Sequence, residues 1–214
     1  MLGERISFLQ QYLQSSPSET EKAFDLCTEL HKIFNALPRF TYKKIDQIPF
    51  ECGIYIIFEK GETYSGLDRI VRVGTHNSQG RLKNRLKDHF LQENEDGSIL
   101  RKNIGKAILN KDRDPYLPIW TLNTSKPENY RYIARQIQDQ TEKRVSDYLI
   151  KNITFTVFPV NDQTLRLRLE KGIIATLNQT KDFGPQSDWL GQYSPEIEIR
   201  TSGLWLKEGL NDQP

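Results

Sequence analysis

The sequence is poor in cysteine, in long apolar runs and in an excess of charge of either sign. Its two cysteines, Cys27 and Cys52, lie far apart and form no CxxC motif, so neither a disulfide scaffold nor a cysteine-ligated zinc site is expected. No apolar run comes near the ~20 residues of a membrane-spanning helix. The first residues, MLGERISFLQQYLQ, lack the apolar segment of a signal peptide. We therefore expect no membrane segment and a cytoplasmic location.

The charge is close to balanced overall but uneven along the chain. Hydrophobic residues make up 36% and charged residues 27%, which indicates a globular protein with a net charge of only +2. Residues 81–87 and 98–111 nevertheless carry basic side chains and no acid. They predict a phosphate-binding face formed by Arg81, Lys83, Lys87, Arg101, Lys102 and Lys106. For the second segment, lysines that are merely solvated explain the pattern equally well.

The N-terminal residues 1–37 predict two helices. Apolar residues at helical spacing mark the first of them: Ile6, Leu9 and Leu13. Ser18 and Glu21 form a capping box at the start of the second helix. Pro38 ends it.

The rest of the chain predicts a small sheet with helices around it. Runs rich in β-branched and aromatic residues predict strands at 53–59, 69–75 and 153–160, of which the first two should pair antiparallel. Helical patterns occupy residues 81–91, 98–109 and 128–150, and a short strand is expected at Ile119–Leu122. Residues 164–179 begin with strand-like alternation, but a helix is favoured because apolar residues recur every fourth position: Leu165, Leu169, Ile173 and Leu177.

Two of the predicted helices carry polar residues beside an apolar stripe. Helical spacing aligns Arg81, Arg85 and His89. The neighbouring stripe is apolar and must face the core: Leu82, Leu86 and Phe90. The Arg/His stripe is therefore expected at the border of the core, beside a cleft. In the later helix, Glu170 and Asn178 share one face in the same way.

In this order, the residues resemble the GIY-YIG nucleases. Gly53-Ile54-Tyr55 matches the first word of the family signature, and Arg85 with His89 matches its catalytic arginine followed by Tyr or His four residues later. Glu170 matches the family's metal-binding glutamate, and Asn178 stands for the asparagine that follows it. The resemblance covers roughly residues 48–110 and 153–180. It departs from the family at the second word.

Where the family has YIG or YVG, the second strand reads Arg72-Val73-Gly74. Tyr64-Ser65-Gly66 offers another alignment, but it lies in the connection between the strands. We prefer the first alignment because Val73-Gly74 leads directly into the basic helix. Arg72 does not deprotonate and so cannot act as a base.

The resemblance implies hydrolysis of a phosphodiester with Mg²⁺ or Mn²⁺ held by Glu170. Tyr55 is then the base, and since a free tyrosine has a pKa of about 10, a nearby cation such as Arg72 favours its phenolate or holds a phosphate. Arg85 suits the developing negative charge, and His89 orients a group or donates a proton. Three further residues are expected around this set: Asn178, His76 and Tyr64. Taken singly, ordinary readings compete, above all a surface ion pair of Glu170 with Arg166.

The implied fold is α/β, with a three-stranded mixed sheet flanked by helices. Residues 1–45 form a helical extension, residues 46–182 the nuclease core with a helical insertion at about 92–152, and residues 183–214 a tail. Its aromatic residues are assigned to packing: Trp189, Tyr193 and Trp205.

The leading function is restriction-type, sequence-specific cleavage of double-stranded DNA. A homodimer on DNA and a cognate methyltransferase encoded nearby are the expected partners. A structure-specific repair nuclease and an inactive DNA-binding module on the same fold are the alternatives.

Overall fold

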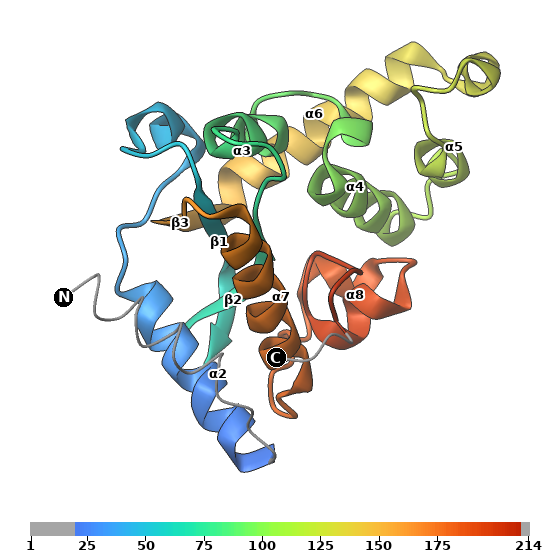
Figure 1. Cartoon of the computed structure of the whole chain (residues 1–214). Helices are drawn as coiled ribbons and strands as arrows, with labels where there is room; N and C mark the ends of the chain where they lie inside the picture. The colour runs from blue at the N-terminus through green and yellow to red at the C-terminus, as the bar shows by residue number, and fades with distance from the viewer. Residues whose placement is uncertain (1–19, 211–214) are drawn as a thin grey trace.

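The computed structural model describes residues 20–210 and is built around one three-stranded sheet (Figure 1). The strands are β1 (Gly53–Tyr64), β2 (Leu67–Gly74) and β3 (Ile153–Pro159), in the order β2-β1-β3. The α/β class and the antiparallel pairing of the first two strands are confirmed. β3 is also antiparallel to β1, so the sheet is wholly antiparallel where a mixed one was expected.

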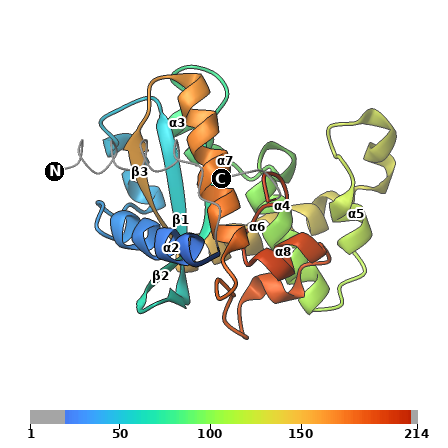
Figure 2. The same ribbon diagram turned by 60° about the horizontal axis from the view of Figure 1, so that its bottom comes forward.

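Helices cover both faces of the sheet because both faces are apolar. One layer consists of α2 (Thr20–Asn35) and α7 (Gln163–Gln179), which pack on Ile54, Ile56 and Phe58. The other layer packs on the opposite face and consists of α3 (Leu82–Phe90), α4 (Ile99–Lys111) and α6 (Arg135–Asn152). Figures 1 and 2 show the two layers from different sides. α7 confirms the choice of helix over strand for residues 164–179.

The insertion between α3 and β3 is helical, as predicted. Besides α4 and α6 it contains the turn η2 (Glu95–Gly97), α5 (Leu117–Thr121) and η3 (Pro127–Tyr132). The strand expected at Ile119–Leu122 is wrong, because α5 occupies this segment. Trp120 decides the local structure: its ring lies against Gly105, where a Cβ would come within 2.4 Å of it, and its Nε1 donates to the carbonyl of Lys102 at 3.0 Å.

The chain after α7 is part of the core. It contains η4 (Leu190–Tyr193) and α8 (Ile197–Ser202). The indoles of Trp189 and Trp205 are buried, as predicted, and both donate to the carboxylate of Glu59, at 3.0 and 2.7 Å. Tyr193, by contrast, is 41% exposed.

The remaining elements complete the N-terminal side. The short helix η1 (Tyr42–Gln47) follows α2 and packs against α3. The first predicted helix and the capping residue Ser18 lie outside the described residues. Within residues 20–210, none of the helices combines the length and apolar character that crossing a membrane requires.

Candidate active site

A polar cavity of about 510 Å³ opens beside the edge strand β2. Helices from both layers reach it, α3 from one side of the sheet and α7 from the other. Four of the five predicted catalytic residues line it: Tyr55, Arg72, Arg85 and Glu170. A second polar cavity, of about 390 Å³ beside Glu59 and Tyr148, contains none of them.

Tyr55 reaches the cavity because the residue opposite it is a glycine. In the β1–β2 register, Tyr55 pairs with Gly74. A Cβ on Gly74 would lie 2.2 Å from the phenol oxygen of Tyr55. The Val-Gly at the end of β2 therefore makes room for the ring, which is a physical reason for a glycine at this point of the motif.

His89 lies behind Tyr55 and does not line the cavity. Its side chain is fully buried, with Nε2 hydrogen-bonded to Tyr55 Oη at 2.8 Å and Nδ1 to Ser98 Oγ at 2.7 Å. Burial, together with the charges of Arg72, Arg85 and Arg101, holds the pKa of His89 well below its usual value. The imidazole is therefore neutral near pH 7, and Tyr55 lies between it and the cavity.

Arg85 is aimed by the turn η2. It lies on the exposed side of α3, and its Nη1 donates to the carbonyl of Gly97 at 3.0 Å. Arg81, one helical turn earlier, lines the same cavity and pairs with Asp88 at 3.2 Å. Both guanidinium groups thus border the space in which a phosphate would lie.

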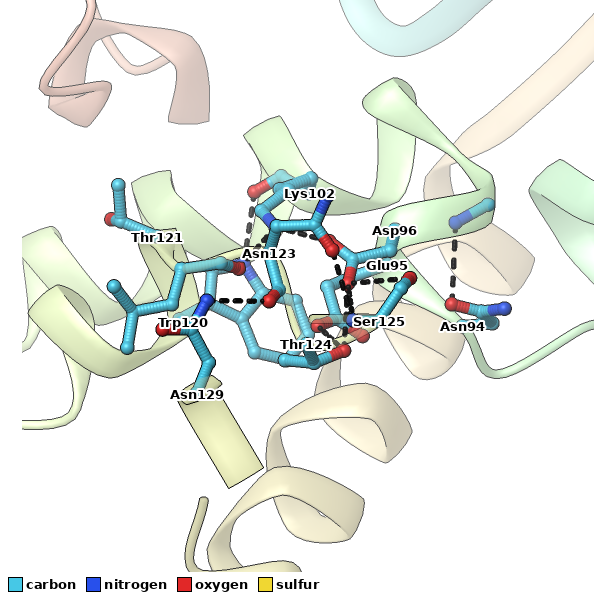
Figure 3. A network of polar contacts seen from close by, with 12 residues as sticks. Asn94, Glu95, Asp96, Lys102, Trp120, Thr121, Asn123, Thr124, Ser125 and Asn129 are labelled. Atoms are coloured by element: carbon cyan, nitrogen blue, oxygen red, sulfur yellow. Dashed lines mark hydrogen bonds and ion pairs between the residues drawn. The ribbon is translucent and has the colours of Figure 1, made fainter. Parts of the chain in front are cut away.

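The turn η2 is itself fixed by later parts of the helical insertion (Figure 3). The carboxylate of Asp96 accepts hydrogen bonds from Lys102, from the hydroxyl of Thr124 at 2.7 Å and from the backbone of Ser125 at 3.0 Å. Burial opposes its charge, but the bonds from Lys102 and Thr124 prevail and hold the pKa of Asp96 below its usual value. The insertion therefore supports the segment that positions Arg85.

Arg72 shares a face of the sheet with Tyr55, since residues two apart on a strand point the same way and Arg72 pairs with Ile57. It is only 7% exposed. Its Nη1 donates to the carbonyl of Trp205, whereas its Nε finds no hydrogen-bond partner among residues 20–210. The tail thus holds a cation at the cavity wall with one donor unused.

Glu170 projects from α7 into the cavity. Burial raises its pKa above the usual value, against the lowering effects of Arg72, the backbone N–H of Thr75 and Arg85. The competing surface pair with Arg166 does not form: that guanidinium is buried and donates to the carbonyls of Val160 and His76, at 3.0 and 3.2 Å.

Of the three further residues expected around the site, His76 lines the cavity and the other two do not. His76 lines the cavity, but both ring nitrogens are engaged: Nε2 accepts from the N–H of Gly53 at 3.3 Å and Nδ1 donates to the carbonyl of Ser78 at 2.6 Å. Asn178 donates to the carbonyl of Leu210, two turns along α7 from Glu170, and is not part of the cavity wall. Tyr64 lies at the far end of β1 and packs against His31.

The basic side chains of α4 are paired with acids, and their phosphate-binding role stays a prediction. Arg101 has no exposed surface and forms a buried ion pair with Glu142 at 2.5 Å. Lys102 is paired with Asp96, and Lys106 with Glu196 at 2.5 Å. These side chains join the helices to one another instead of facing solvent.

On α3, the lysines form surface ion pairs. Lys83 pairs with Glu51 at 2.9 Å and Lys87 with Asp46 at 2.7 Å. Both acids are exposed, so such pairs are weak and a phosphate can compete for the lysines. Their contact with DNA stays a prediction.

The sequence did not single out several groups that shape the site. The predicted helix over residues 98–109 begins at Ser98, but nothing in the sequence marks Ser98 as a partner of His89. The carbonyls of Gly97 and Trp205 carry no sequence signal, because any residue supplies a carbonyl. Among these groups, only Thr75 lies next to the signature motif, because it directly follows Val73-Gly74.

The chain matches the family model of the GIY-YIG domain over residues 15–213, which is most of its length. It belongs to the GIY-YIG family. Comparison with curated proteins and with solved structures gave no match. The GIY-YIG domain is that of nuclease-type hydrolases, which act on DNA and generally depend on a divalent metal ion.

In this GIY-YIG chain the family match extends well beyond the two segments that carry the motif. It includes α2, the helical insertion and the tail. The same parts pack into the core and hold Arg72 and Arg85 in place.

Proposed function

We propose that the protein is a metal-dependent endonuclease that cleaves double-stranded DNA at specific sequences, in the manner of a restriction enzyme. The convergence of Tyr55, Arg72, Arg85 and Glu170 on one cavity carries this proposal. A phenol, two guanidinium groups and one carboxylate are the groups that phosphodiester hydrolysis requires: a base, cations for the phosphate oxygens and a metal ligand.

The residues present fit a magnesium or manganese ion. Glu170 offers a carboxylate in a polar cavity that has room for water and phosphate, and no cluster of three or more His, Cys, Asp or Glu ligands occurs among residues 20–210. An ion bound by one carboxylate and several waters is typical of Mg²⁺. When bound, it would supply Lewis-acid stabilisation of the phosphate oxygens.

The side chains of the chain then have distinct tasks. Tyr55, as phenolate, takes a proton from the attacking water, whose oxygen forms the new bond to phosphorus as the ester oxygen leaves. Arg85 and the unused Nε of Arg72 bind the non-bridging oxygens, on which negative charge grows. Arg72 lines the same cavity and shares a face of the sheet with Tyr55, so a cation in place of tyrosine is compatible with phosphate binding there.

Restriction-type specificity follows from the resemblance and from the helices around the core, which are suited to gripping a duplex. A cutter with one site per chain cleaves both strands either as a pair of copies or by binding twice, and of these we propose a homodimer on DNA, which matches the symmetry of the duplex. A methyltransferase that protects the same sequence would be its partner in the cell.

The experiment is digestion of plasmid and genomic DNA with Mg²⁺, using wild type, Glu170→Gln and Glu198→Gln. Glu198 is exposed on α8 and serves as the matched control. We expect discrete fragments from wild type and from the control, and a rate at least about 100-fold lower for Glu170→Gln with DNA affinity within a few-fold. Fragments without a common sequence would favour the structure-specific, repair-type alternative.

An inactive DNA-binding module is the other alternative. It predicts that wild type and Glu170→Gln are equally inert on linear, nicked and branched DNA while both bind it. Tyr55→Phe separates catalysis from folding in an active enzyme: cleavage should be lost and affinity retained. A large loss of affinity would instead assign Tyr55 a structural role.

A further inference from the structure

Ser98 lies at the junction of the active site and the helical insertion, and two hydrogen bonds converge on its hydroxyl. As the N-cap of α4, its Oγ accepts from the N–H of Arg101 at 3.3 Å. The same Oγ lies 2.7 Å from Nδ1 of His89. Ser98 is 1% exposed, so bulk solvent does not reach its hydroxyl.

His89 has two possible neutral forms, and they place different demands on this hydroxyl. A neutral imidazole carries one proton, on Nδ1 or on Nε2. If Nδ1 carries it, Ser98 Oγ accepts two N–H groups and its own hydrogen is left buried without an acceptor, since no other partner of Oγ exists among residues 20–210. If Nε2 carries it, the Ser98 hydroxyl donates to Nδ1, and the hydrogen of the Tyr55 hydroxyl turns to the polar cavity that Tyr55 lines, whereas Ser98 lines no such cavity.

We propose that Ser98 is a positioning residue that fixes His89 in the Nε2–H form, so that His89 donates a hydrogen bond to the oxygen of Tyr55. The reason is the rule that buried polar hydrogens are paired. His89 is then a fixed donor and takes no proton from Tyr55. The phenolate oxygen receives this bond, and in the neutral phenol the Tyr55 hydrogen points toward the cavity.

The other two histidines provide an internal contrast. His31 Nδ1 donates to the carbonyl of Cys27 at 2.7 Å while its Nε2 accepts from the N–H of Ile70 at 3.2 Å. His76 likewise donates from Nδ1 and accepts at Nε2. Because the chain has only 3 histidines, the inference predicts two imidazoles of the Nδ1–H form and one of the Nε2–H form.

The anchoring of Ser98 supports a role beyond capping. The turn η2 immediately before it presents the carbonyl of Gly97 to Arg85 and is held by Asp96. One rigid segment therefore orients two groups of the site, the guanidinium of Arg85 and the imidazole of His89. A residue that only capped α4 would not need to contact His89 or to follow a turn that holds Arg85.

The direct test is the ¹H–¹⁵N correlation spectrum of the histidine side chains in the full chain at pH 7.5, where the lowered pKa values keep all three neutral. We expect one Nε2–H pattern in wild type, retained in Ser98→Thr. Ser98→Asp caps the helix equally well but has no proton to give, so His89 should change to the Nδ1–H form. Three Nδ1–H patterns in wild type would overturn the proposal, whether or not Ser98→Asp folds.

A kinetic test rests on the proposed nuclease function. Ser98→Thr should cleave within about threefold of wild type, whereas Ser98→Asp should lose at least about tenfold in single-turnover rate with unchanged DNA affinity. Equal rates for both variants would contradict the role of Ser98 in positioning. If wild type cleaves no DNA, the proposed function fails, while the spectrum still decides the form of His89.

Discussion

At the scale of single residues, the site depends on close approaches that allow no substitution. Gly74 leaves the space that the Tyr55 ring fills, and Tyr55 in turn reaches His89. Arg72 is held by one carbonyl and keeps one donor unused. Each of these contacts fixes the position of a side chain closely, and the rate of catalysis can fall when a reacting group is displaced by about 1 Å.

Gly74→Ala should therefore abolish cleavage. The added methyl would lie 2.2 Å from Tyr55 Oη and must displace the phenol from the cavity. We expect a rate at least about 100-fold lower, with DNA affinity within a few-fold, since a misplacement of about 1 Å can cost that much.

Gly184→Ala is the matched control, because a Cβ there meets nothing within 4 Å. Single-turnover cleavage and urea unfolding of both variants provide the measurement. If Gly74→Ala cleaves as fast as Gly184→Ala, Tyr55 is not the base.

The convergence of the motif residues on one cavity was easier to predict than the surroundings of the basic residues, for a physical reason. Tyr55, Arg85 and Glu170 stand in a motif whose order reflects one chemical task, and the structure brings them to one cavity. Arg101 differs because its partner, Glu142, comes from a distant helix. A basic run on one segment says nothing about an acid that folding brings to it.

At the scale of elements, the short turn η2 links the insertion to the site. Its carbonyl at Gly97 holds Arg85, and Ser98 follows directly. Lys102, Thr124 and the backbone of Ser125 hold it through Asp96 (Figure 3). Loss of the Asp96 contacts should therefore lower both the stability of the fold and the rate of catalysis.

Asp96→Asn should lower the free energy of unfolding by about 1–3 kcal/mol, because a part-buried charged acceptor of several donors is weakened. Cleavage should slow by at least about tenfold, since Arg85 and His89 lose their common support. Urea unfolding and single-turnover cleavage provide the two measurements.

Asp147→Asn, at an exposed position of α6, should change neither quantity. A stable Asp96→Asn variant with full activity would show that η2 holds its shape without the anchor.

Elements with a regular pattern were predictable, and elements fixed by distant contacts were not. Apolar residues at every fourth position were sufficient to identify α7 as a helix. The segment around Ile119 has too few residues for a period to show, and the docking of Trp120 on Gly105 decides its form. This contact cannot be predicted from the local sequence, because it depends on the position of α4 in the folded chain.

At the scale of the whole molecule, two helical layers meet at the edge strand that carries the site. In the α2/α7 layer, His31 joins α2 to β2 by accepting from the N–H of Ile70. It is surrounded by Cys27, Tyr64 and Arg69, and burial is the main cause that lowers its pKa to about 4. The fold therefore holds this imidazole uncharged.

Acid should destabilise the fold through His31. The unfolded chain binds a proton near pH 6.5 and the folded one only near pH 4, so the contribution is complete above pH 6.5 and is lost as the pH falls toward 4. Since one pKa unit corresponds to about 1.36 kcal/mol, the free energy of unfolding should fall by about 3 kcal/mol. Urea unfolding of wild type and His31→Gln at pH 7 and pH 4.5 measures it.

The comparison with His31→Gln is needed because other groups act in the opposite direction. Burial raises the pKa of Glu59 and of Glu142, and such groups lose stability as the pH rises. Their effect is common to both proteins, so the difference isolates His31. Equal losses for wild type and variant between pH 7 and pH 4.5 would refute the assignment.

The hydrogen bond between Arg72 and the carbonyl of Trp205 makes the candidate site depend on the C-terminal segment. All side chains assigned to the chemistry lie between Tyr55 and Glu170, so a fragment ending after α7 would contain every one of them. It would lack the carbonyl that fixes Arg72 and both indoles that bind Glu59. During synthesis the reactive groups leave the ribosome before this strut does. Arg72 therefore gains the carbonyl of Trp205 only after every one of these side chains has been made.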